Sequence, residues 1–157
     1  MLTVRRVSVM SLITGCAVVL GPVAGAQATD ATLRATIKND VPKITRSQAK
    51  ILDGLATLQK SGSAKAVVKA INAQDRNLTA LKNRVAGESS STSAGSKGKS
   101  DVTKGLALIV KSNTTLAGDL SKASSGKPVS KTQVKAATAE VKKGNVEINA
   151  GAKLLKV

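Results

Sequence analysis

Lysine and serine are the side chains with the capacity for chemistry in this sequence, since residues 29–157 contain no histidine, cysteine or aromatic residue. Three Ser-x-x-Lys tetrapeptides begin at Ser47, Ser96 and Ser124. At this spacing a lysine deprotonates a nucleophilic serine in the penicillin-recognising enzymes. The companion motifs of that enzyme class are missing. A chain so rich in serine and lysine contains this spacing by chance. We therefore expect no serine-type catalysis.

Two other catalytic patterns are also incomplete. Gly98-Lys99-Ser100 resembles the end of a phosphate-binding loop, but position 93 is serine where the first glycine is required. Glu140 and Glu147 share a helix face, where we expect them to pair with lysines such as Lys143 rather than to flank a sugar in a cleft. The sequence thus predicts no enzymatic activity, no cofactor and no metal site.

Positive charge is the feature that remains, because 25 Lys and Arg face 9 Asp and Glu, a net charge of +16. Such a chain attracts anionic partners: a wall polymer, an acidic polysaccharide, an anionic membrane surface or extracellular DNA. Lysine lacks the bidentate geometry of arginine, and no aromatic ring is present to stack on bases, so we expect no specific nucleic-acid readout. The clustered lysines that we expect to bind polyanions are Lys97, Lys99, Lys104, Lys122, Lys127, Lys131, Lys135, Lys142, Lys143, Lys153 and Lys156.

The first 28 residues have the order of a secretory signal peptide. Arg5 and Arg6 precede an apolar run over residues 7–24, and the small-x-small triplet Ala26-Gln27-Ala28 follows it. Cleavage after Ala28 would remove both arginines and lower the net charge to +14. We therefore expect a secreted or cell-envelope-associated protein.

Two alternatives for the N-terminus stay open. Residues 13–16 resemble a lipobox, which would make Cys16 the lipid-modified first residue of a lipoprotein. The apolar run is also close to the roughly 20 residues that span a bilayer, so an uncleaved anchor is the other alternative. Gly21-Pro22 and the small-residue triplet favour cleavage instead.

Apolar residues at heptad spacing predict helices throughout residues 29–157, as one domain. A first hairpin is expected over 41–87, with a turn at Lys60-Ser61-Gly62-Ser63 and a short lead-in helix that Pro42 separates from the main one. Residues 87–100 are rich in serine and glycine and are expected to be a flexible linker. A second hairpin is expected over 101–157, with its turn at 124–128.

The hairpins should bury each other's apolar stripes, which predicts an all-α fold, an antiparallel four-helix bundle. In the last helix, Ala137, Gly144 and Gly151 repeat every seven residues, and we expect them to let a neighbouring helix approach closely.

One amide lies near the middle of each apolar seam, at Gln48, Gln74, Asn113 and Asn145. They lie at similar depth, so we expect a buried polar layer that fixes helix register. A ligand held at this layer is less favoured, because no carboxylate lies there.

Two functions from different classes follow from these patterns. In the first, the exported helical protein binds anionic polymers or surfaces through lysine. In the second it is a structural or oligomerising protein, whose heptad seams pair with other copies or with a partner, and lysine serves only solubility. Binding that weakens steeply as the salt concentration rises is typical of the first function. Self-assembly that does not depend on the salt concentration is typical of the second.

Overall fold

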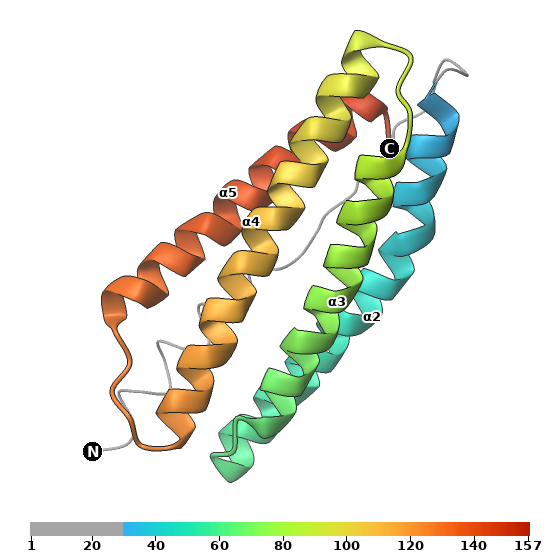
Figure 1. Cartoon of the computed structure of the whole chain (residues 1–157). Helices are drawn as coiled ribbons and strands as arrows, with labels where there is room; N and C mark the ends of the chain where they lie inside the picture. Colours follow the sequence, from blue (N-terminus) through green and yellow to red (C-terminus); the bar gives the residue numbers. More distant parts are fainter. Residues whose placement is uncertain (1–29) are drawn as a thin grey trace.

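The computed structural model describes residues 30–157, so the predicted signal peptide at 1–28 lies outside the described residues. These residues form four helices, α2 (Ala31–Ser61), α3 (Lys65–Gly87), α4 (Ser93–Ser124) and α5 (Lys131–Leu155), and no strand. The prediction of an all-helical chain is therefore confirmed. Successive helices pack on one another, α2 on α3, α3 on α4 and α4 on α5, and the ribbon reverses direction at each connection (Figure 1).

The apolar core consists of two clusters. One gathers the start of α2, the end of α3, the first half of α4 and the end of α5, and includes Leu33, Val85 and Leu155. The other gathers the end of α2, the start of α3, the end of α4 and the start of α5, and includes Ile51, Ile71 and Ala137. Leu, Ile, Val and Ala supply all of this buried apolar surface, so the side chains that fill the core are small and the helices must pack closely.

The predicted lead-in helix is not a separate element. Residues 31–61 form one helix, and Pro42 lies inside it. Proline lacks the N–H that would bond to the carbonyl of Lys38. Both residues lie on the exposed side of α2, where the carbonyl of Lys38 does not need a partner within the protein. The helix therefore continues through the proline.

The prediction of a flexible linker over 87–100 is wrong for most of its length, because α4 begins at Ser93. Thr92 caps this helix, since its hydroxyl accepts from the backbone N–H of Gly95 at 2.8 Å. Gly95 and Gly98 are buried, Gly95 against Asp30 and Gly98 against α5. The serine and glycine composition thus suits close packing here, and only residues 88–92 connect α3 to α4.

Glycines on α4 and α5 bring the two backbones into contact, as expected for Gly144 and Gly151. A Cβ atom at Gly144 would lie 2.8 Å from the carbonyl oxygen of Gly105, and one at Gly151 would lie 2.6 Å from that of Gly98. Real Cβ atoms essentially never come so close. Residues 98 and 105 of α4 therefore meet residues 151 and 144 of α5 at positions where only glycine fits.

This contact predicts opposite effects for one substitution at two places in α4. Gly105→Ala should lower the free energy of unfolding by about 1–3 kcal/mol, because its methyl group overlaps the backbone of Gly144 and the side chain of Ile148. Gly118→Ala meets no atom within 4 Å, so it should raise stability by up to about 1 kcal/mol through helix propensity. Denaturant unfolding followed by circular dichroism measures both. Equal effects would contradict the close approach.

Candidate functional site

Two of the four predicted layer amides form a hydrogen bond between α3 and α4. Gln74 is 1 % exposed and Asn113 is 2 % exposed. Asn113 Nδ2 donates to Gln74 Oε1 at 3.3 Å and to Asp75 Oδ1 at 2.8 Å. The Thr114 hydroxyl lies 3.4 Å from Asp75 Oδ2. α3 and α4 are therefore joined by a short polar network between the two apolar clusters.

The other two predicted amides do not occupy the buried layer positions. At this level of α2 the buried polar residue is Ser47, whose hydroxyl donates to the carbonyl of Ile44 at 2.8 Å, while the neighbouring Gln48 is half-buried. On α5 Gly144 faces α4 and Asn145 is half-buried beside it. On each of these two helices, the residue at the layer is therefore one position before the predicted amide. The polar layer is therefore asymmetric, with amides on α3 and α4 and small residues on α2 and α5.

Several carboxylates are directed between helices rather than outward. Asp40 is buried and forms an ion pair with Arg84 across α2 and α3, and a second with Lys43 at 3.1 Å. Between α4 and α5, Lys111 Nζ lies 2.7 Å from Glu140 Oε1, and Lys104 Nζ lies 2.8 Å from Glu147 Oε1. These glutamates were expected to pair with lysines such as Lys143, and the ion pairs instead use lysines of α4.

The remaining acidic residues also have partners within the molecule, with one exception. Asp30 accepts from the backbone N–H of Ser91 at 3.1 Å and from the hydroxyl of Thr92 at 2.6 Å. Asp101 and Asp119 pair with lysines on their own helix, and Glu88 accepts from Thr36. Only Asp53, of the nine acidic residues, makes no ion pair or side-chain hydrogen bond among the described residues. The anionic side chains thus contribute little to the outer surface.

The pKa directions follow from these contacts. Hydrogen bonds from Thr92 and Ser91 lower the pKa of Asp30, and the hydrogen bond from Lys111 lowers that of Glu140. Glu147 raises the pKa of Lys104. Burial raises the pKa of Asp75 and outweighs the hydrogen bonds that it accepts.

Four of the predicted polyanion-binding lysines have partners inside the molecule. Lys97, Lys104 and Lys122 form ion pairs with acidic residues. Lys99 donates to the carbonyls of Ala86 and Glu88 at 3.1 and 2.7 Å, and so closes the end of α3. Lys97, Lys104 and Lys122 remain exposed and Lys99 is half-buried, and the charge of these four lysines is partly compensated or used in capping.

The other seven predicted lysines are exposed and form no ion pair within residues 30–157. Four of them share one face of α5, because their spacings of 4, 7 and 11 residues are close to whole helical turns. We call Lys131, Lys135, Lys142 and Lys153 the α5 lysine stripe. Lys127 precedes it in the α4–α5 connection, Lys156 follows it, and Lys143 flanks it.

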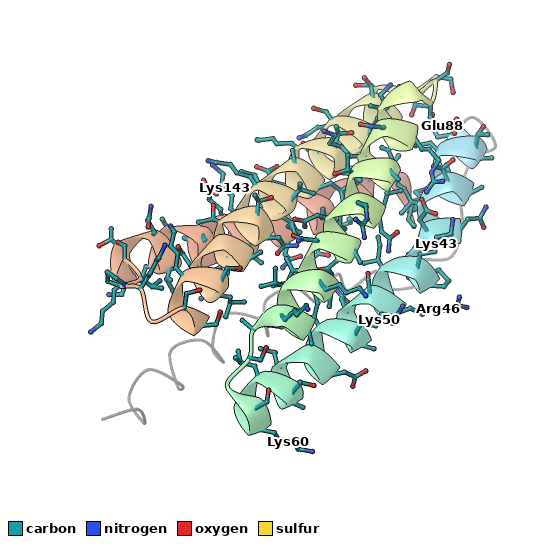
Figure 2. The ribbon with its side chains drawn as sticks, turned by 60° about the horizontal axis from the view of Figure 1, so that its bottom comes forward. Lys43, Arg46, Lys50, Lys60, Glu88 and Lys143 are labelled. Carbon is teal, nitrogen blue, oxygen red and sulfur yellow. The ribbon has the colours of Figure 1, made fainter. Side chains whose placement is uncertain are left out.

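A second cationic row, on α2, was not predicted. Lys43, Arg46 and Lys50 are exposed and recur at spacings of three and four residues. Figure 2 shows them with Lys60 along the outer side of α2, and Lys143 on the other side of the molecule. The same helical spacing in the sequence would have revealed this row, which was missed because its lysines are not densely clustered.

No cluster of His, Cys, Asp and Glu within residues 30–157 is arranged to hold a metal ion. None of the helices in this part of the chain combines the length and apolar character needed to cross a membrane. Comparisons with protein-family models, curated proteins and solved structures give no match. The arrangement of the charged side chains is therefore the feature from which a function can be inferred.

The two aspartates at the helix contacts should respond oppositely to substitution. Because the pKa of Asp30 is lowered, its stabilisation is present above 3.8, its ordinary value, and is lost as the pH falls through the folded-state pKa. Asp30→Asn should therefore lower the melting temperature at pH 7 and make a smaller difference at pH 3.

Because burial raises the pKa of Asp75, its ionised form destabilises the folded state at pH 7, and this effect is relieved as the pH falls through the raised folded-state pKa. Asp75→Asn keeps an acceptor for Asn113 and should raise the melting temperature at pH 7, with a smaller gain near pH 3. Melting curves followed by circular dichroism at both pH values measure both variants, and shifts of the same sign would contradict this assignment.

Proposed function

We propose that this chain is an exported, non-catalytic helical protein that binds anionic polymers or surfaces of the cell envelope through lysine side chains. The observation that carries the proposal is that acidic side chains are bound within the molecule while many lysines are not. Eight of the nine acidic side chains are bound inside the molecule or at its helix ends, whereas the α5 lysine stripe has no acidic partner among the described residues. The outer surface is therefore strongly cationic.

The proposed scaffold is an antiparallel four-helix bundle built from two hairpins, α2–α3 and α4–α5. The contacts between successive helices and the alternating course of the ribbon support this arrangement (Figure 1). A rigid α5 holds the stripe straight over about 33 Å, since 22 residues separate Lys131 from Lys153 and each adds 1.5 Å. A polymer lying along α5 would meet all four ammonium groups at once.

Lysine suits a partner recognised by charge density rather than by a fixed geometry. Each exposed ammonium group contributes little alone, but several neutralised charges release several counterions from a polyanion. Binding through the stripe should therefore be tight at low salt and weak at moderate salt. Wall polymers, acidic polysaccharides, anionic membrane surfaces and extracellular DNA all carry closely spaced charges of this kind.

The second candidate is a structural or oligomerising protein whose seams pair with other copies. Against it, the seam residues are buried in contacts within the chain, and the exposed large hydrophobic residues are Leu52, Val146 and Leu154 among residues 30–157. Assembly of the folded protein that is independent of salt would favour this candidate over polymer binding.

Replacing the stripe should strongly weaken polymer retention. In the quadruple variant Lys131→Gln, Lys135→Gln, Lys142→Gln and Lys153→Gln, retention on immobilised acidic polysaccharide at low salt should fall by about tenfold or more, because about four phosphate- or carboxylate-neutralising contacts are lost. Measuring the eluted fraction against salt concentration should also show a shallower salt slope than in the unsubstituted protein.

The matched control removes the same number of charges elsewhere, with Lys38→Gln, Lys50→Gln, Lys60→Gln and Lys82→Gln. It should retain most of the binding, because the stripe stays intact. If both variants lose binding equally, net charge rather than the α5 lysine stripe determines retention, and no retention of the unsubstituted protein on any anionic polymer at low salt would remove the proposed function.

Export is checked by the mass of the protein recovered outside the cytoplasm. Cleavage after Ala28 leaves a chain that begins at Thr29. A lipid-modified chain that begins at Cys16 would instead establish the lipoprotein alternative, and recovery of the uncleaved precursor in the membrane fraction would establish the anchor. Substituting Ala28→Arg should block cleavage at the expected site, whereas Val23→Leu should leave it unchanged.

A further inference from the structure

A groove with a volume of about 580 Å³ lies between the start of α3 and the end of α4. It is separate from the α5 lysine stripe, and no lysine of the predicted polyanion-binding set lines it. Its lining includes the apolar side chains of Ala64 and Val68. No acidic residue is among the side chains that line it.

The α3 wall of this groove presents hydrogen-bond donors. Lys65, Lys69, Asn72 and Arg76 recur at spacings of four, three and four residues, so they project from one face of α3. All four are exposed, and the three cations form no ion pair within the described part of the chain. The neighbouring Asp75 bonds to Asn113 and Thr114 and is not part of the lining. This wall therefore carries three uncompensated positive charges.

The α4 wall presents hydrogen-bond acceptors. The hydroxyl of Ser121 donates to the carbonyl of Ala117 at 2.9 Å. The hydroxyls of Ser124 and Ser125 donate to the carbonyl of Ser121 at 3.0 and 2.9 Å. Because each hydroxyl proton is used within the helix, the lone pairs of the three oxygens remain to accept from a ligand.

We propose that this groove binds an acidic oligosaccharide, with its carboxylates on the α3 wall and its sugar hydroxyls on the α4 wall. The inference rests on the proposed function and narrows its partner to a glycan. Inorganic phosphate or polyphosphate at neutral pH would satisfy the cations but offers few donors to the serine oxygens. DNA presents phosphates without free hydroxyl groups along its backbone, and the groove has no aromatic ring for its bases. A uronic acid sugar carries both kinds of group.

The test uses the mature protein and tetragalacturonate, a short oligosaccharide that cannot extend along all of α5 and the groove together. Backbone amide signals of residues 65–76 and 121–125 should shift on titration at low salt, with one site per chain. The double variant Lys69→Gln and Arg76→Gln should weaken binding about tenfold, because two charge-assisted hydrogen bonds are lost. Its matched control, Lys135→Gln and Lys142→Gln in the stripe, should change the affinity less than about twofold.

A second variant tests the glycan chemistry rather than the charge. Ser121→Ala and Ser125→Ala together should weaken tetragalacturonate binding about threefold or more, because two acceptors for sugar hydroxyls are lost. They should leave the binding of inorganic tripolyphosphate unchanged. Helical circular dichroism confirms that each variant is folded, and because all four positions are exposed, folding should be preserved.

The outcomes separate this inference from the proposed function. If long acidic polysaccharide is retained but tetragalacturonate shifts the stripe amides and not the groove amides, the groove inference is wrong and polymer binding stands. If the serine variant weakens glycan binding and tripolyphosphate binding equally, or if it weakens neither of them, the site recognises charge alone and not a glycan. If tripolyphosphate or a short DNA duplex binds the groove as tightly as the glycan, the assignment to sugars is also overturned.

Discussion

The hydrogen bond between Gln74 and Asn113 sets the register of this protein. Both amides are almost fully buried, so a shift of α3 along α4 would leave polar groups without partners in an apolar core, at a cost of about 1–3 kcal/mol each. The bond joins α3 to α4 between the two apolar clusters. Leucine and valine contacts alone would tolerate such a shift far better. The polar pair therefore specifies which residues of α3 and α4 meet.

The placement of charge depends on this register and on the contact between α4 and α5. With the glycines of these helices opposed, Glu140 meets Lys111 and Glu147 meets Lys104. Asp40 is likewise enclosed between α2 and α3, where Arg84 and Lys43 neutralise it. An excess of lysine in the composition would by itself allow carboxylates to be mixed among the lysines on the surface. Packing directs them inward instead, and the exterior becomes more uniformly cationic than the net charge implies.

The existence of the helices, and two of their connections, could be predicted from the sequence because heptad spacing and Ser/Gly turns are local signals. The Gln74–Asn113 pair and the exposed lysines of α5 could also be predicted, since both follow from position along one helix. Local composition failed for residues 93–100. Their helix depends on contacts with distant residues, as at Gly98 against Gly151, and these are not visible in a Ser/Gly-rich stretch.

The polar-layer predictions that differ from the structure by one residue have a similar cause. Ser47 rather than Gln48 faces the core because the buried face of α2 also includes Asp40, which its ion pair with Arg84 draws inward. An apolar seam chosen by hydrophobicity places Val41, rather than Asp40, on the buried face of α2. The groove between α3 and α4 lay beyond sequence reasoning for another reason. Lys69 and Ser121 are far apart in the chain, and only the relative placement of two helices makes them opposite walls.

The backbone contact between α4 and α5 has a consequence for how the protein opens. Glycine loses more conformational entropy on ordering than any other residue, so a segment containing Gly95, Gly98 and Gly105 has little tendency to stay helical in isolation. Its order is supplied by distant residues, because Gly95 packs against Asp30, whereas Gly98 and Gly105 pack against α5 at Gly151 and Gly144. The first three turns of α4 and the last three of α5 should therefore exchange their amide hydrogens as one cooperative unit, although they lie some forty residues apart in the chain.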